Sequence, residues 1–315
     1  MTNKVLLIFF LFAISSPSLS KDINTECKEF IKNSEVSENN ANEKEKLLFE
    51  KGVLWKVITP KNKVNYLYGT MHSQDYLVSK YPHEVKHVLV SSKKLILEVI
   101  PDNISNSVYI DRMYYKNSKR LDQILDGVFF ERLKQQLDSY NLSENQIKKI
   151  KYLKPWAAFN LIGRPKPVRA PSLESNLFRL AKERGLIVES LESMDNIISS
   201  LEKINEADQI NILKDTICNR KEIIRDIKKL VNLYVNRDIV GIRAFNDIKH
   251  SNKRFYDQFM QIMLNDRNKK MLKTIKEEFE FGDVFVAVGI SHLIANNSLL
   301  AVSYTHLTLP TILLV

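Results

Sequence analysis

The stretch Val64–His72, VNYLYGTMH, decides how the rest of the chain is interpreted. It is a short apolar run that suits a buried strand, followed by a glycine and, three residues later, a histidine. The same order of residues returns near the other end of the chain as Val284–His292, VFVAVGISH. Glycine adopts backbone angles that are closed to other residues, so we expect Gly69 and Gly289 to let the chain leave the sheet sharply.

A histidine just past the end of a buried strand lies at the rim of the sheet, where side chains converge on ligands. Neutral imidazole is the commonest metal ligand and also an acid or base near neutral pH. One such motif is a weak pattern, because a single histidine is more often structural than catalytic. The matched pair is harder to explain by packing, and it makes His72 and His292 candidate functional residues.

The composition is that of an ordinary globular protein. With 315 residues, 44% of them hydrophobic, the chain is long enough for one large domain or two small ones. The formal net charge is +10, with 47 Lys and Arg against 37 Asp and Glu. The basic residues are scattered and no nucleic-acid motif is found in the sequence, so we interpret the charge as a solvated surface and expect no nucleic-acid partner.

The first part of the chain resembles an export signal. Residues 1–20 combine a positive start, an apolar segment at 5–14 and a small-x-small cleavage site at Ser18–Ser20. No later segment is apolar and long enough to be a transmembrane helix. We therefore expect a periplasmic or secreted mature protein without a transmembrane segment, beginning with a polar, flexible lead at 21–46.

The two cysteines, Cys27 and Cys218, leave two interpretations open. Export to an oxidising compartment would allow a disulfide between them, whereas two unpaired thiols are the alternative, and spacing does not decide between these. They are too far apart in sequence to be the close cysteine pair of a structural zinc site.

The periodicity predicts an α/β fold with a mainly parallel central sheet flanked by helices. Strands are expected at residues 54–59, 64–69, 94–99, 186–191 and 283–288. Helices are expected at residues 82–92, within 121–162 with a capping box at 143–146, and at 173–184, 193–234 and 255–279. A helix between the second and third strands implies a parallel crossover, which brings Glu98 to the same rim as His72.

We interpret residues 47–301 as one α/β domain that contains a large helical insertion, at about 104–172 and 193–280. The proline-rich stretch 163–172 is a loop, which is a connector, a hinge or part of a substrate entrance. His83 and His87 share one helical face at a spacing that can bind metals, but the pattern has no other support. We assign these two histidines to a solvated surface.

Six stretches occur in the order found in the TraB/PrgY/GumN family, whose animal members are the TIKI proteins, and resemble its motifs. They are residues 54–72, 93–99, 154–158, 172–193, 266–271 and 286–293. The resemblance covers roughly residues 50 to 300 and implies an EreA/ChaN-like fold. Where the family often has Gly-x-Asp and Gly-Leu-Glu, this chain has Ser172-Leu173-Glu174 and Ser190-Leu191-Glu192.

The resemblance also implies a chemistry. The TIKI branch consists of metal-dependent proteases that need both G-x-x-H motifs and an acidic residue, and bacterial relatives are linked to peptide-pheromone shutdown and to polysaccharide gene clusters. His72, His292 and Glu98 form a familiar ligand set for a divalent ion of the Mn, Co or Zn type. Glu192 or Glu98 is the candidate general base. Arg267 pairs with a carboxylate or stabilises a developing oxyanion, and a purely structural ion pair is an equal alternative.

Three functions follow as hypotheses. The first is an exported metal-dependent hydrolase, a peptidase that acts on a peptide or protein substrate. The second is a non-catalytic periplasmic protein of the same fold that binds haem or a peptide. The third is an interaction protein that keeps the fold without activity. The sequence does not reveal the substrate, the metal or the oligomeric state.

The tail differs in character from the rest. Residues 302–315, VSYTHLTLPTILLV, resemble a translated sequencing-library adapter, whereas the family would continue with a helix and a terminal strand. We therefore exclude this segment from fold reasoning and do not count His306 as a candidate ligand.

Overall fold

The computed structural model describes residues 25–28, 30, 51–138, 140, 142–246, 253–294, 298–300 and 313–314. The predicted signal peptide lies outside these residues, as do most of the flexible lead and most of the tail. Within the lead, Thr25–Cys27 form a short 3-10 helix, η1.

The centre of the fold is a mixed sheet with the order β4-β3-β5-β2-β1-β6. Its strands are β1 (Leu54–Ile58), β2 (Val64–Thr70), β3 (Lys94–Leu97), β4 (Ile187–Ser190), β5 (Val284–Gly289) and β6 (Leu313–Leu314). Neighbours among β4, β3, β5 and β2 are parallel, whereas β1 is antiparallel to β2 and to the two-residue β6. All five predicted strands are present, and the predicted α/β class is confirmed.

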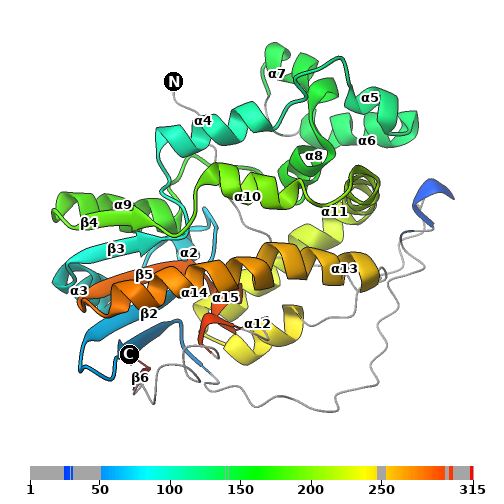
Figure 1. Ribbon diagram of the computed structural model, residues 1–315. Helices are drawn as coiled ribbons and strands as arrows, with labels where there is room; N and C mark the ends of the chain where they lie inside the picture. The colour runs from blue at the N-terminus through cyan, green and yellow to red at the C-terminus, as the bar shows by residue number, and fades with distance from the viewer. Residues whose placement is uncertain are drawn as a thin grey trace.

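Helices cover the sheet and build a separate helical part above it in Figure 1. They are α2 (Tyr76–Ser79), α3 (His83–Ser91), α4 (Asn103–Arg112), α5 (Leu121–Ile124), α6 (Gly127–Asp138), α7 (Glu144–Lys149), α8 (Pro155–Ile162), α9 (Leu173–Glu183), α10 (Met194–Leu201), α11 (Glu206–Val235), α12 (Ile239–Asn246), α13 (Lys253–Met260), α14 (Asp266–Phe279) and α15 (Ile290–Ile294), with shorter turns η2 (Ile150–Tyr152) and η3 (Gln261–Asn265). The predicted capping box is present, because Ser143 and Gln146 cap α7 reciprocally. None of the described helices is both long and apolar enough to cross a membrane.

Two hydrophobic clusters divide the interior. One surrounds the sheet and takes in side chains from α3, α9 and α14. The other lies among α4, α5, α6, α8, α10 and the first half of α11. Cys27 and Cys218 form a disulfide that joins η1 to α11, so the alternative of two free thiols is wrong. His83 and His87 are exposed on α3, as the assignment to a solvated surface requires.

The register of β2 and β5 brings the two G-x-x-H motifs together. These strands are parallel neighbours, and Gly69 lies opposite Val288 while Thr70 lies opposite Gly289. The buried Asn65 supports this register, since its amide donates to the Phe279 carbonyl at 3.0 Å and accepts from the Val284 amide at 3.2 Å. Both G-x-x-H motifs therefore leave the sheet side by side, at the carboxyl ends of adjacent strands.

Candidate functional site

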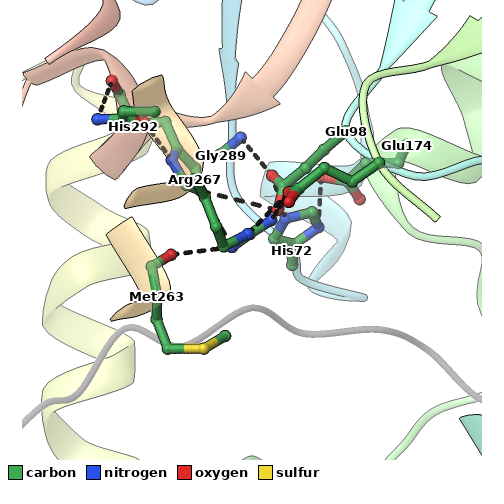
Figure 2. A network of polar contacts seen from close by, with 9 residues as sticks. His72, Glu98, Glu174, Met263, Arg267, Gly289 and His292 are labelled. Atoms are coloured by element: carbon green, nitrogen blue, oxygen red, sulfur yellow. Dashed lines mark hydrogen bonds and ion pairs between the residues drawn. The ribbon is translucent and has the colours of Figure 1, made fainter. Parts of the chain in front are cut away.

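Four strand ends and one helix contribute the side chains of the site. His72 follows β2, Glu98 follows β3 directly and Glu192 follows β4, whereas His292 belongs to α15, which starts where β5 ends. Arg267 reaches the same place from the first turn of α14 (Figure 2). The structure thus brings together every residue that the sequence singled out for the site, because parallel strands present their carboxyl ends at one edge of the sheet.

Arg267 bridges two carboxylates. Its Nη2 donates to Glu98 Oε1 and lies 2.6 Å from Glu192 Oε2, and its Nε donates to the same Glu192 oxygen at 2.7 Å. Arg267 is 2% exposed and Glu98 3%. Burial lowers the pKa of Arg267, but the two carboxylates outweigh this effect and raise it. A guanidinium so enclosed fixes the relative positions of both acids.

A π-helical turn precedes Arg267. Residues Gln261–Asn265 form this turn between α13 and α14, where the sequence predicted one continuous helix. Arg267 Nη1 donates to the Met263 carbonyl within it at 3.0 Å (Figure 2). Single π-turns inside helices recur at functional sites, because they redirect side chains and carbonyls that a regular helix would hold along its axis.

His292 is oriented by Asn268. The Asn268 amide nitrogen lies 3.5 Å from the His292 carbonyl, which leaves its oxygen to accept the proton of His292 Nδ1 at 2.6 Å. The other ring nitrogen, Nε2, then faces Glu98 Oε1 at 3.7 Å and Arg267 Nη1 at 3.4 Å. Burial lowers the pKa of His292, so the neutral ring with a lone pair on Nε2 is favoured.

His72 is oriented by a different kind of partner. Its Nδ1 lies 2.9 Å from Glu174 Oε1, and its Nε2 lies 3.7 Å from Glu98 Oε2. Burial lowers the pKa of His72, but the Glu174 and Glu98 carboxylates outweigh burial and raise the pKa to about 10. At neutral pH this pKa favours the charged imidazolium, which forms an ion pair with the Glu174 carboxylate.

Glu98 lies between the two rings and presents one carboxylate oxygen to each. Burial would raise its pKa, but Arg267 and the histidines outweigh burial and hold the pKa well below its usual value. The backbone amide of Gly289 also donates to Glu98 Oε2 at 3.2 Å. Glu98 is therefore an ionised acceptor whose two oxygens are held in fixed directions.

The two glycines have a different role from the one that the sequence predicted. Neither Gly69 nor Gly289 has a positive φ, so the expectation of special backbone angles is wrong. A Cβ at Gly69 would lie 2.3 Å from Ile290 Cδ1, which shows that α15 packs onto β2 at this point. A Cβ at Gly289 would lie 3.6 Å from Glu98 Oε2, 3.6 Å from His292 Cδ2 and 3.7 Å from His72 Nε2. Glycine here leaves a small space that all three side chains border.

The side chains around this space, two imidazoles and a carboxylate, are of the types that hold divalent cations. Two imidazole Nε2 atoms face one carboxylate at 3.7 Å, and ligands that share a tetrahedral ion are about 3.4 Å apart. Within the described part of the chain, however, no group of three or more His, Cys, Asp and Glu side chains is arranged so that it could hold a metal ion. Glu98 turns a different oxygen to each ring, and its Oε1 accepts from Arg267 Nη2.

Sequence reasoning missed two residues of the site, Glu174 and Asn268. Both were quoted within longer motifs, and neither was assigned a role. Asn268 directly follows Arg267 in α14, so its neighbour was the available signal. Glu174 lies in the first turn of α9, where an acidic residue is ordinary because it complements the helix dipole, so the available signal was that it stands where the family often has the acid of Gly-x-Asp.

The fold and the site together define an α/β protein with a buried His-Glu-Arg centre at the carboxyl edge of its sheet. The TraB/PrgY/gumN family profile matches residues 53–303, which is most of the chain, and the chain belongs to this family. Searches of curated proteins and of solved structures found no match.

Proposed function

We propose that the protein is an exported metal-dependent hydrolase that cleaves peptide bonds. One observation carries the proposal: His72 and His292, from opposite ends of the chain, direct their Nε2 atoms at the two oxygens of a single buried carboxylate. A packing role would not need both rings to face the same acid. Membership of the TraB/PrgY/gumN family, whose TIKI branch resembles this chain in its motifs, supports the same activity.

In this proposal His72, His292 and Glu98 hold the metal. A bound divalent ion of the Mn, Co or Zn type supplies polarisation of the scissile carbonyl and lowers the pKa of water toward neutrality. Glu192 is the general base, since Glu98 is engaged as a ligand. Arg267 keeps Glu192 in place through its Nε, at 2.7 Å from Glu192 Oε2. Its positive charge also stabilises an oxyanion that develops nearby.

The disulfide supports the proposed location. Disulfides persist in the periplasm and outside the cell, whereas cytosolic thiols are kept reduced. Cys27 and Cys218 are bonded, which agrees with the export that the first 20 residues suggest. We therefore propose a periplasmic or secreted enzyme with a peptide or protein substrate.

The test combines metal content with cleavage. The full chain, purified without chelators, is analysed for Mn, Co and Zn and is then incubated with a mixed peptide library that is read by mass spectrometry. We expect about one bound ion per chain and cleavage that EDTA abolishes and added metal restores. His72→Ala and His292→Ala should both lose the ion and the cleavage. The double variant His83→Ala, His87→Ala removes two exposed histidines and should behave as the wild type.

Two results would contradict the proposal. Protein that binds none of these ions after dialysis against each would remove its chemical basis. Protein that binds an ion and a peptide but leaves the peptide intact would favour the non-catalytic peptide-binding alternative. The haem-binding alternative gains no support from the geometry, because Glu98 and Arg267 lie within 3.7 Å and 3.4 Å of His292 Nε2, where the macrocycle would have to fit.

A further inference from the structure

We propose that Glu174 is the positioning residue of the centre: it fixes the ring of His72 so that Nε2 is directed at Glu98. The proposal rests on the proposed function, because it assigns the second partner of one metal-binding histidine. Glu174 would not itself touch the metal or the substrate. It would act only through His72 Nδ1, which lies 2.9 Å from Glu174 Oε1.

The geometry of imidazole makes this contact decisive. The two ring nitrogens are part of one rigid plane, so a partner that holds Nδ1 also sets the direction of the Nε2 lone pair. Histidine ligands in metal centres usually donate the other ring N–H to a carboxylate or a carbonyl, which fixes the tautomer and increases the basicity of the ligand. In this structure Glu174 faces Nδ1 at 2.9 Å while Nε2 faces Glu98 at 3.7 Å.

The surrounding elements hold Glu174 rigidly. The buried Ser172 caps α9 by accepting from the Ser175 amide at 3.2 Å. Leu173 and Leu177 anchor the same helix in the core, and Glu174 is only 7% exposed. Two residues further along α9, Asn176 donates to the Ser79 carbonyl at 2.9 Å, which ties the helix to the segment that follows His72. Helix α9 therefore contacts His72 through Glu174 and the end of α2 through Asn176.

His292 also has a side-chain partner at its Nδ1 atom, but that partner is of a different chemical type. Asn268 from α14 accepts the Nδ1 proton of His292 at 2.6 Å, and Glu174 from α9 forms an ion pair with His72 Nδ1 at 2.9 Å. One partner is a carboxylate and the other is a neutral amide. Removing Glu174 therefore takes away both an acceptor and a negative charge, whereas removing Asn268 takes away an acceptor alone. Loss of Glu174 should therefore change the state of the His72 ring more than loss of Asn268 changes that of the His292 ring.

The experiment compares wild type, Glu174→Gln, Glu174→Ala and Asn268→Ala as full chains. The first measurement is NMR of protein labelled with 15N-histidine, without added metal. In the wild type the Nδ1–H of His72 should exchange slowly with water, because the side chain is only 9% exposed and Nδ1 lies 2.9 Å from Glu174 Oε1. Glu174→Ala should abolish this signal, Glu174→Gln should keep it with a changed chemical shift, and Asn268→Ala should affect only the corresponding signal of His292.

The second measurement is calorimetric titration with ZnCl2. Glu174→Ala should weaken zinc binding by about 10- to 100-fold, the range found when such outer partners are removed, with Glu174→Gln between it and the wild type. The control is Glu183→Ala, which removes an exposed glutamate of the same helix and should bind zinc like the wild type. A merely structural Glu174 would lower the free energy of unfolding when replaced and leave the chemical shifts of the His72 ring unchanged.

The outcomes separate this inference from the proposed function. Wild-type zinc binding that is lost in His72→Ala but unchanged in Glu174→Ala would overturn the role of Glu174 and leave the metal centre intact. If the wild type bound no zinc, the proposed function would fail, and the NMR measurement would still decide whether Glu174 orients His72. Should Glu174→Ala not fold, an unchanged His72 resonance in the isosteric Glu174→Gln variant would overturn the inference by itself.

Discussion

Gly289 borders all three side chains proposed to hold the metal. A Cβ at this position would be in van der Waals contact with side chains of His72, Glu98 and His292, at distances from 3.6 to 3.7 Å. Its backbone amide also donates to Glu98. The residue therefore contributes a hydrogen-bond donor and, by the lack of a side chain, the space between three polar groups. Gly69 has the equivalent place in the first motif, but there the missing side chain makes room for Ile290.

This contrast predicts opposite effects of one methyl group. Gly289→Ala should fold with a free energy of unfolding within about 1 kcal/mol of the wild type, since its contacts are of ordinary length, yet lose zinc binding because the methyl occupies the shared space. Gly69→Ala should lose roughly 1–3 kcal/mol of stability, because its Cβ would overlap Ile290 Cδ1, and still bind zinc below its melting temperature. Urea unfolding and calorimetric titration of both variants measure the two effects. Equal zinc affinities for the wild type and Gly289→Ala would show that the ion does not bind in this space.

Helix α11 is the element that connects the two parts of the interior. It spans 30 residues, is interrupted by non-helical angles at Asn219, and contributes to both hydrophobic clusters. In its last turn, the Tyr234 hydroxyl donates to the carbonyl of Gly69, the first residue of the first G-x-x-H motif, at 2.8 Å. Close to the interruption lie the disulfide at Cys218 and the carboxylate of Asp215, which accepts from Asn219 Nδ2 at 2.9 Å.

Asp215 should make stability depend on pH. Burial raises its pKa to about 6, against a smaller opposite effect of the Asn219 hydrogen bond. The native state then holds the proton more tightly than the unfolded state, so stability is greatest below about pH 4 for this group and falls as the pH rises through 6. The full shift corresponds to roughly 3 kcal/mol. The expected loss at pH 7 is about 1–2 kcal/mol, because the side chain is only half-buried and solvent screens its charge.

Asp215→Asn should therefore stabilise the protein at pH 7 by about 1–2 kcal/mol and have little effect at pH 4. Urea denaturation at several pH values measures this dependence. Asp138→Asn, which changes an exposed carboxylate at the end of α6, is the control and should stay within about 0.5 kcal/mol of the wild type. A stabilisation by Asp215→Asn that is equal at both pH values would rule out the ionisation as its cause.

At the scale of the whole molecule, the site and the disulfide belong to different parts of the structure. The site lies at the edge of the sheet, next to the cluster that surrounds β2, β3 and β5. Cys27 belongs to the helical cluster, and its partner Cys218 packs against the same cluster. The two cysteines are 191 residues apart in sequence, so their bond closes most of the chain into one loop.

Removing the disulfide should therefore affect stability and spare the centre. Closing so long a loop restricts the unfolded chain, and the double variant Cys27→Ser, Cys218→Ser should lose about 2–5 kcal/mol of stability. Its zinc affinity, measured under conditions where it is folded, should match that of the wild type. Unfolding of the wild type with and without a reducing agent provides the comparison. A variant that is as stable as the wild type would contradict the prediction, because it would show that the disulfide does not stabilise the fold by restricting the unfolded chain.

Much of this architecture could be predicted from local patterns. The strands around Gly69 and Gly289, the helix that ends before Gly185 and the capping box of α7 all follow from residue types at short spacing. The family resemblance, carried by motifs in a fixed order, indicated that His72, Glu98, Glu192, Arg267 and His292 belong to one site. Periodicity did not predict that the helix expected at residues 255–279 contains the π-turn Gln261–Asn265, because hydrophobic spacing tolerates one wide turn.

The sequence by itself thus determined the elements, the approximate class of fold and the chemical types gathered at the rim, because these depend on residues close together in the chain. Only the tertiary structure decided which groups hold the histidines. Glu174 and Asn268 reach His72 and His292 across a packed interface, from helices whose place depends on the whole core. The disulfide and the space beside Gly289 also depend on the tertiary structure, because both arise from distances between segments that no local pattern encodes.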